Sequence, residues 1–397
     1  MSGFLTGIKV VSLTHFLQGP TCAQFLADLG ADVVKVERIG GAFERHVSNL
    51  NAFLGEGESL FFLMTGRNQR SIELDLASAD GKAVLWRLLE EADVLIENFR
   101  PGVLDKLGFS YEAVQARRPD LVYCSLSGYG STGPDKNKPG QDLLIQAHSG
   151  LVTLSGTAEG PPIPVGSTIV DQHSGTLGAL GIIAALFGRT RSGQGVRVDA
   201  NLFSAALHLQ IEPFSCHLNG YQLYPKSETG VSTRFHAAPY GSFQASDGWL
   251  ILSRTEGPAL AAAFGDETFR RWSPNDQYTY REEINSLIAS HLKNNTVKHW
   301  VRVFDENKIW YSLIRDYEEI EADPQLAANQ AVLEFETQRA GKVRVLNHPI
   351  QYDGAVPGLR RPPPSLGADT AEVLREIGFS DSAIGDLSTR KSIGPLT

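Results

Sequence analysis

The sequence predicts an α/β protein: a large domain with a doubly wound, Rossmann-like parallel sheet, and a smaller α+β domain. In the first half of the chain, apolar runs of strand length alternate with segments of helical length. This alternation is typical of a parallel sheet covered by helices on both faces. The 397 residues suffice for two domains, and 42% hydrophobic with 20% charged residues is an ordinary globular composition.

The elements of the large domain follow one another regularly. Gly19-Pro20 opens the first helix, because proline fits the first helical turn. The predicted strands are Ile8–Leu13, Asp32–Glu37, Ser71–Leu74, Asp93–Glu97, Leu121–Ser127 and Val196–Ala200. The predicted helices are Gly19–Leu29, Asp80–Glu91, Ser174–Arg189 and Asn201–His217.

The second half of the chain has a different pattern. An irregular stretch, 219–239, precedes two apolar runs around Asp247-Gly248, which indicate a β-hairpin, and then charged helices over 256–307. Two strands (Ala331–Glu336, Gly341–Val345) and a helix (Thr370–Ile377) close the chain. We therefore predict a large domain over 1–220, completed by 330–397, and a linker with the small domain over 221–329.

Composition argues against several classes of protein. A net charge of −9 does not suit a nucleic-acid-binding protein. Cys22, Cys124 and Cys216 are far apart, so neither a disulfide framework nor a metal site is expected. The N-terminus lacks signal-peptide features, and the most apolar run, Leu177–Phe187, is shorter than the roughly 20 residues of a membrane span. We expect a cytoplasmic protein with no membrane partner.

The turn after the first strand lies where dinucleotide-binding proteins hold a pyrophosphate. Residues 12–20 contain no GxGxxG, which would let the backbone approach the phosphates. Glu37 lies at the end of the second strand, where a ribose-binding acid would be, but one acid is weak support. A nicotinamide-dependent oxidoreductase is therefore a minor alternative.

Several segments, taken together, resemble one family over nearly the whole chain. They are Gly7–Arg38, Gly66–Leu76, Asp93–Glu112, Gly128–Pro134, Gly140–Gly150 and Ser365–Gly378. In sequence and order they are similar to the family III (CaiB/BaiF) CoA-transferases, which include formyl-CoA:oxalate and carnitine CoA-transferases and α-methylacyl-CoA racemases. The resemblance implies an interlocked, ring-like homodimer that uses coenzyme A thioesters as substrates and holds no permanent cofactor.

Asp171 aligns with the catalytic aspartate of that family. It precedes an apolar helix, so we expect it near a helix N-terminus, where N–H groups and the helix dipole favour a carboxylate. A carboxylate can act as a covalent nucleophile. The resemblance implies an acyl-aspartyl anhydride and then an aspartyl-CoA thioester, with no ATP or metal. Without the resemblance, an N-cap or loop aspartate would be the simpler interpretation.

The predicted CoA-binding residues come from the resemblance, position by position. His15, Phe16, Leu17 and Gln18 match the turn that lines the thiol and pantetheine, with Gln18 one residue away from the glutamine of the oxalate enzymes. The other positions are Arg38 (adenine side), Leu74 (apolar contact), Asn98, Phe99 and Arg100 (the NFxPG loop), Lys106 (phosphate side), Lys138 (one residue from a family lysine) and Asp142. A solvated surface charge is the ordinary alternative for each cation.

Gly140-Gln141-Asp142 separates transferases from racemases. The racemases of the family have histidine at the position of Gln141, and it removes the α-proton of the acyl-CoA. Glutamine has no ionisable group for this task, so racemisation is disfavoured. Asp142 is expected to hydrogen-bond CoA or the acyl group, with a turn or N-cap position as the alternative. Arg234 is a candidate partner for a second carboxylate.

The sequence therefore predicts an acyl-CoA:carboxylate CoA-transferase for small, preferably dicarboxylic, acids. Residues 232–243 lack the glycine-rich lid of the oxalate enzymes, so oxalate itself is less favoured. The alternatives are an α-methylacyl-CoA racemase or epimerase, and a CoA-thioester binding protein without turnover.

Overall fold

The computed structural model describes residues 3–228 and 231–396, which form two compact units. The large unit comprises Met1–Ile145, Thr168–Ala205 and Pro324–Thr397, and the small unit comprises Gln146–Ser167 and Ala206–Asp323. This division differs from the predicted boundaries. Residues 146–167 and 206–220 belong to the small unit, and the chain re-enters the large unit at Pro324 and not at residue 330. Composition alone does not reveal that the chain leaves the large unit twice.

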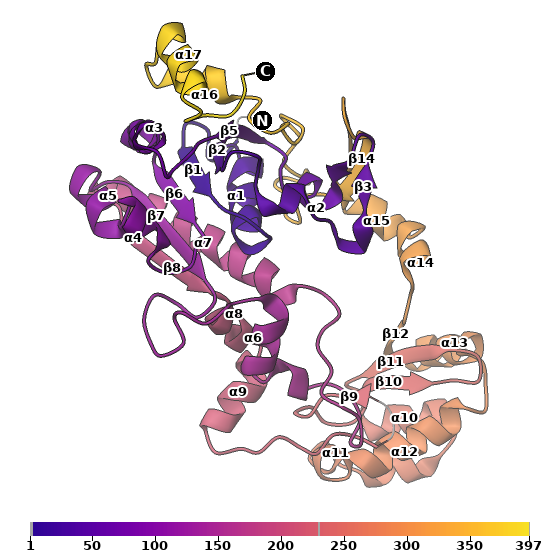
Figure 1. Ribbon diagram of the computed structural model, residues 1–397. Coiled ribbons are helices and arrows are strands. Elements are labelled where there is room, and N and C mark those ends of the chain that lie inside the picture. The colour runs from indigo at the N-terminus through magenta and orange to yellow at the C-terminus, as the bar shows by residue number, and fades with distance from the viewer. Residues whose placement is uncertain (1–2, 229–230, 397) are drawn as a thin grey trace. The chain divides into compact units, whose positions relative to one another are not determined.

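A six-stranded parallel sheet forms the centre of the large unit (Figure 1). Its strands in spatial order are β5 (Gln69–Glu73), β2 (Asp32–Glu37), β1 (Lys9–Leu13), β6 (Val94–Glu97), β7 (Val122–Ser127) and β8 (Arg197–Asn201). All five pairings are parallel. The chain order reverses between β1 and β6, as in the Rossmann arrangement, and ligands bind such sheets at the carboxyl ends of the strands beside this reversal.

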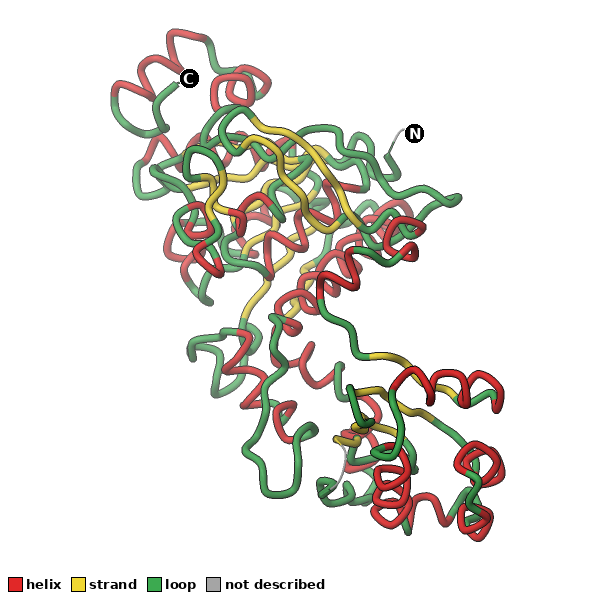
Figure 2. Tube along the Cα trace, turned by 90° about the vertical axis from the view of Figure 1, so that its right-hand side faces the viewer, coloured by secondary structure: helices red, strands yellow, loops and turns green. Residues whose placement is uncertain are grey.

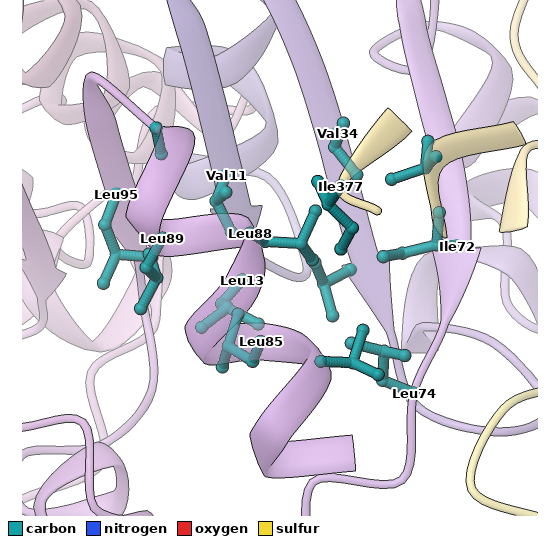
Figure 3. Close-up of a cluster of buried hydrophobic side chains, with 14 of the residues drawn as sticks. Val11, Leu13, Val34, Ile72, Leu74, Leu85, Leu88, Leu89, Leu95 and Ile377 are labelled. Atoms are coloured by element: carbon teal, nitrogen blue, oxygen red, sulfur yellow. The ribbon is translucent and has the colours of Figure 1, made fainter. Parts of the chain in front are cut away.

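Helices cover both faces of this sheet, which confirms the doubly wound prediction (Figure 2). On one face, α1 (Gln18–Asp28) and α7 (Ile169–Ser192) pack over Val10, Ile96 and Cys124. The opposite face is covered by α3 (Ala79–Glu91), α5 (Tyr111–Arg117), α16 (Thr370–Glu376) and α17 (Asp381–Thr389). Figure 3 shows Leu85, Leu88 and Leu89 of α3 among strand residues of that face.

The C-terminal segment completes the large unit. Strands β13 (Val332–Thr337) and β14 (Gly341–Leu346) form the predicted antiparallel pair, and α16 begins at Thr370 as expected. Helix α17 was not predicted, although Ser380 caps it by accepting a hydrogen bond from the N–H of Ala383. Shorter elements of the large unit are β3 (Phe53–Leu54), β4 (Glu58–Ser59), α2 (Leu60–Leu63), α4 (Val103–Leu107), α15 (Pro324–Ala328), η1 (Phe43–Arg45) and η2 (Asn49–Asn51).

The small unit is α+β. Its four-stranded sheet has the order β12 (Trp310–Leu313), β11 (Trp249–Ser253), β10 (Tyr240–Gln244) and β9 (Val231–Ser232), and β10–β11 is the predicted hairpin. Phe243, Leu250, Phe269, Trp300 and Phe304 form its core. Its helices are α10 (Gly257–Phe264), α11 (Asp276–Thr279), α12 (Arg281–Leu292), α13 (Val297–Asn307) and α14 (Tyr317–Glu321), with η3 (Leu151–Thr153) and η4 (Glu267–Arg271).

Two helix predictions need correction. The single helix predicted over Asn201–His217 is two helices, α8 (Leu202–His208) and α9 (Ile211–Leu218), because Gln210 has non-helical backbone angles. Helix α7 has 24 residues and is therefore longer than its most apolar run indicates. By length and composition α7 could span a membrane. However, it packs with α1 in a hydrophobic core, as core helices of soluble proteins do, and a cytoplasmic location stays a prediction.

Candidate active site

Asp171 lies in the first turn of α7. The helix begins at Ile169, so Asp171 is its third residue and does not precede the helix as predicted. The N-cap residue Thr168 makes no side-chain capping bond. Instead, Oδ2 of Asp142, at the start of α6 (Asp142–His148), accepts hydrogen bonds from the N–H groups of Val170 (2.8 Å) and Asp171 (2.9 Å). Asp142 thus satisfies two of the N–H groups that a helix leaves unpaired at its N-terminus.

This arrangement places a second carboxylate beside Asp171. The sequence had suggested that the helix N–H groups favour the Asp171 anion, but two of them are directed at Asp142. Burial and the negative charge of Asp142 raise the pKa of Asp171 to about 7. Both effects disfavour the ionised form, and a carboxylate with a raised pKa is a stronger base and nucleophile once it ionises.

Close packing between α1 and α7 fixes the position of Asp171. The side-chain amide of Gln18 donates to Oγ of Ser174 (2.7 Å) and to the carbonyl of Ser127 (3.4 Å). A Cβ added at Gly175 would lie 2.5 Å from the carbonyl oxygen of Gln18. Ser174 and Gly175 follow Asp171 by one helical turn, so the same face of α7 carries all three residues. Asp171 therefore lies beside the start of α1, just beyond the end of β1.

The turn between β1 and α1 is held by hydrogen bonds from three directions. Asn98 accepts from the N–H of His15 (2.9 Å) and donates to its carbonyl (2.8 Å). Phe16 has a positive φ of 62° and donates its N–H to Glu44 (3.0 Å). Glu44 forms a buried ion pair of 2.7 Å with Lys35, which also donates to the carbonyl of Thr14 (2.8 Å). A strained residue held so firmly is a common feature of functional sites.

Aromatic side chains gather on this turn. Ring centroids are 5.1 Å apart for His15 and Phe16, 5.4 Å for His15 and Phe99, and 4.5 Å for Phe16 and Phe43. Phe16 and Phe43 are 45% and 43% exposed, so an apolar surface faces solvent at this edge of the sheet. Burial lowers the pKa of His15, with Lys35 and Arg38 adding to the effect and Glu44 opposing it, so the imidazole is neutral at neutral pH.

A cavity of about 310 Å³ is lined by Glu97 and Ser127 at the carboxyl ends of β6 and β7, and by Arg197 at the amino end of β8. Its lining includes three cations, Arg100, Lys136 and Arg197. It also includes Glu97, which accepts hydrogen bonds from the hydroxyl of Ser125 (2.5 Å) and the N–H of Phe99 (3.0 Å). Burial outweighs these hydrogen bonds and raises the pKa of Glu97 to about 7. The cavity is therefore polar, and its lining also includes the carboxylates of Asp105 and Glu112, which remain when Glu97 is protonated.

The predicted CoA-binding residues are in different environments. Arg100 lines the cavity, and Arg38 is exposed, with its Nε donating to the carbonyl of Gly41 (2.9 Å). Lys106 is exposed on α4, and the exposed Lys138 pairs with Asp135 at 2.8 Å. The side chains of Leu17 and Leu74, 5% and 1% exposed, face the interior. The residues brought together around one turn are His15, Phe16, Asn98 and Phe99.

Sequence reasoning missed several residues that support the site. Lys35 could have been noticed, because a charged residue in the middle of an apolar strand requires a buried partner. Glu44, Ser174 and Arg197 have no local signal. Glu37, considered earlier as a ribose ligand, is buried and accepts hydrogen bonds of 2.7 Å from Nε and Nη2 of Arg45. Burial alone would raise the pKa of Glu37, but Arg45 lowers it to about 2.

Two further predicted features concern other parts of the chain. In the small unit, the guanidinium of Arg234 donates to the carbonyls of Tyr224 (2.8 Å) and Thr153 (3.4 Å). Within residues 3–228 and 231–396 there is no group of three or more His, Cys, Asp or Glu side chains suited to a metal ion.

Known proteins resemble this chain over nearly its whole length. Residues 5–370 match the family described as CoA-transferase family III. An acyl-CoA transferase of Fusarium pseudograminearum is 34% identical over 96% of this chain and 86% of its own length. The succinyl-CoA:glutarate CoA-transferase of Homo sapiens is 30% identical over 96% and 88%, and the formyl-CoA:oxalate CoA-transferase of Shigella sonnei is 29% identical over 99% and 100%.

Solved structures agree with these relatives. The crystal structure of a CAIB/BAIF family protein from Brucella suis is 28% identical, with a TM-score of 0.80 over 95% of this chain and 100% of that chain. The resemblance inferred from the sequence motifs is confirmed, and the oxidoreductase alternative loses its basis. The chain is an enzyme of acyl-CoA metabolism that uses CoA thioesters and carboxylic acids, and it belongs to CoA-transferase family III.

Proposed function

We propose that Asp171 is the nucleophile of an acyl-CoA:carboxylate CoA-transferase. The observation that carries this proposal is the position of Asp171: a partly buried carboxylate in the first turn of α7, beside Asp142, with its pKa raised to about 7. A carboxylate with this pKa is ionised in a large fraction of molecules at neutral pH and is more nucleophilic than an ordinary aspartate.

The proposed reaction has four displacement steps. A carboxylate oxygen of Asp171 attacks the thioester carbonyl of the donor, the C–S bond breaks, and CoA leaves as a thiolate. The thiolate attacks the Asp171 carbonyl of the resulting anhydride and expels the donor acid. The acceptor carboxylate then attacks the aspartyl-CoA thioester, forming a second anhydride and releasing the thiolate. The thiolate finally attacks the acceptor acyl carbonyl, which yields the new thioester and regenerates the Asp171 carboxylate.

The turn between β1 and α1 and the cavity supply the proposed CoA site. His15, Phe16 and Phe99 offer an apolar surface suited to pantetheine, beside the start of α1, against which α7 packs. Arg100, Lys136 and Arg197 line the cavity beside β6, β7 and the start of β8, and cations there suit the phosphates of CoA. Asn98 contributes indirectly, because both ends of its amide hold the backbone of His15.

The proposed acceptors are small carboxylic acids, with dicarboxylic acids preferred. This preference is supported by two relatives, one named for succinyl-CoA and glutarate and the other for formyl-CoA and oxalate. Gln141 speaks against racemisation, because it cannot take up a proton from carbon.

A homodimer is also part of the proposal. On α7, Leu180 and Phe187 are 61% and 60% exposed, although the helix carries mostly apolar residues. Large apolar side chains on one helix are unusual at a free surface. We assign this face of α7 to a second copy of the chain, in line with the interlocked dimer that the sequence resemblance implies, and analytical ultracentrifugation of Leu180→Lys would test it by showing monomers.

Covalent labelling tests the catalytic proposal. The purified protein is incubated with succinyl-CoA or acetyl-CoA, treated with hydroxylamine or borohydride, and digested for mass spectrometry. Modification at Asp171, absent from Asp171→Ala and retained in Asp381→Asn, is the expected result, with a loss of at least ~10³-fold in transfer rate for Asp171→Ala. Exchange of α-protons with deuterium in enzyme that never labels would contradict the proposal and favour a racemase.

A further inference from the structure

Asp142 was predicted to contact CoA or the acyl group, yet its side chain is directed at α7. It is only 4% exposed, and Oδ2 accepts the N–H groups of both Val170 (2.8 Å) and Asp171 (2.9 Å). One oxygen thus fixes the backbone of the residue proposed as nucleophile and of its neighbour. Its side chain lies at the N-terminus of a 24-residue helix, where the helix dipole is positive.

We propose that Asp142 is a positioning residue that fixes the Asp171 backbone and whose negative charge favours the acylated form of Asp171 over the free carboxylate. The inference rests on the proposed function, since it assumes that Asp171 becomes acylated. No atom is exchanged with Asp142 at any step. Asp142 contributes a fixed negative charge beside Asp171. Asp171 is itself negatively charged as a free carboxylate and neutral once acylated.

The physical reason is the change of charge at Asp171. Before the reaction two carboxylates share the start of one helix, and repulsion between them destabilises the free Asp171 anion. Formation of an anhydride or thioester removes the charge of Asp171 and therefore removes the repulsion. The N–H groups of Val170 and Asp171 remain hydrogen-bonded to Asp142 throughout. The covalent intermediate is therefore stabilised relative to the free enzyme.

Among the described residues, Asp142 is the charged group that acts on Asp171. Helix α7 contacts α1, β7 and β8. The titratable residues on these elements and on α6 and α7 themselves are Cys22, Asp28, Tyr123, Cys124, Asp142, His148, Asp171, His173, Arg189, Arg191, Arg197 and Asp199. Burial and the Asp142 charge are the two causes of the altered ionisation of Asp171 among the described residues.

Carboxyl ¹³C NMR of protein labelled at aspartate Cγ measures the coupling without any substrate. Asp171→Asn assigns the Asp171 resonance, and Asp381→Asn is the control for removing a distant exposed carboxylate. In Asp142→Asn the side-chain oxygen still accepts both N–H groups but carries no charge. We expect the ionisation constant of Asp171 to rise about tenfold, which is a midpoint about one pH unit lower. An unchanged midpoint would overturn the proposal.

The wild-type protein provides a second measurement that does not depend on the folding of a variant. If the two carboxylates interact, the Asp142 resonance shifts with the same midpoint as Asp171. That shift should disappear in Asp171→Asn. An Asp142 resonance that is indifferent to the ionisation of Asp171 would also contradict the proposal.

The intermediate itself gives the functional readout. The protein is incubated with succinyl-CoA and succinate at a fixed ratio, and the aspartyl-CoA thioester is trapped. The ratio of thioester to free enzyme should be about tenfold lower in Asp142→Asn than in wild type. Asp142→Glu should restore part of it, because the charge returns. If wild type and Asp142→Asn are labelled equally, the role of Asp142 is refuted and the proposed function stands. If wild type is not labelled at all, the proposed function itself is refuted.

Discussion

The side-chain amide of Gln18 donates a 2.7 Å hydrogen bond to the hydroxyl of Ser174 and so joins the first turn of α1 to the helix that carries Asp171. Gln18 is 5% exposed and also reaches the carbonyl of Ser127. Its amide is therefore engaged in holding two helices and a strand end together. The position was predicted to line the thiol of CoA, and the structure gives its side chain a supporting part in the same site.

Replacement of Gly175 tests the contact between these helices. An alanine Cβ would lie 2.5 Å from the carbonyl oxygen of Gln18 and 2.9 Å from Cβ of Thr21, so Gly175→Ala should destabilise the protein by about 2 kcal/mol. A Cβ added at Gly188, on the same helix, would meet no atom of another part of the described chain within 4 Å, and Gly188→Ala should stabilise the protein by about 0.5–1 kcal/mol. Urea unfolding compares the two variants, and equal effects would show that the helices are not closely packed at Gly175.

Asp171→Asn should change how stability depends on pH. The pKa of Asp171 is about 7 in the folded protein and near 3.8 in the unfolded protein. Between these pH values Asp171 is protonated in the native state and ionised in the unfolded state. Ionisation of Asp171 therefore lowers the free energy of unfolding progressively between about pH 4 and pH 7. We expect Asp171→Asn to be more stable than wild type by roughly 2 kcal/mol at pH 8 and to lose this advantage at pH 4, as measured by denaturant titration at both pH values. A pH-independent difference would be inconsistent with the raised pKa.

The buried pair of Lys35 and Glu44 should behave as an interdependent unit. Glu44→Leu leaves the ammonium of Lys35 without its carboxylate in the interior and removes the acceptor of the Phe16 N–H, so we expect a loss of about 3–5 kcal/mol. Adding Lys35→Met to it should recover part of that loss, because no unpaired charge remains. A double-mutant cycle by thermal unfolding measures the coupling, and additive effects would argue against the ion pair.

Asn98→Ala should weaken CoA binding more than it weakens the fold. Both hydrogen bonds to the backbone of His15 are lost, which frees the turn that we assign to pantetheine. Loss of about 1–2 kcal/mol of preorganisation corresponds to roughly a tenfold rise in KM for the thioester. Steady-state kinetics test this, with Asn294→Ala, an exposed position in the small unit, as the control. An unchanged KM would contradict the assignment of this turn to the CoA site.

The sequence predicted the sheet well because five of its six strands are mostly buried, β8 being the exception. Asp32–Glu37 was predicted with the observed bounds and the other five strands within two residues, and most of them contain clear apolar runs. Helix α7 was placed five residues too late, because the polar residues Asp171, Gln172 and His173 separate Ile169 and Val170 from the apolar pattern that follows.

The site was harder to predict than the fold. Asp171 was singled out from a resemblance, and its surroundings depend on residues distant in sequence. Asp142 and Glu44 are ordinary acids until the fold brings them to the N–H groups of Asp171 and Phe16. No local pattern encodes such pairs, because the partner of each carboxylate is a backbone group whose availability depends on tertiary structure.

The hydrogen bond between Asp142 and the Asp171 backbone joins residues 29 positions apart, and the chain between them passes through 146–167, which belongs to the small unit. The contact between Asp142 and the first turn of α7 thus closes a loop of chain, and the middle of that loop is folded as part of the small unit. Closing a loop costs conformational entropy, and ordering its middle elsewhere reduces that cost. An insertion in 151–163 would consequently alter the tether on which the proposed nucleophile depends. Through this stretch of chain, sequence changes in one unit reach the chemistry of the other without any residue of the site being replaced.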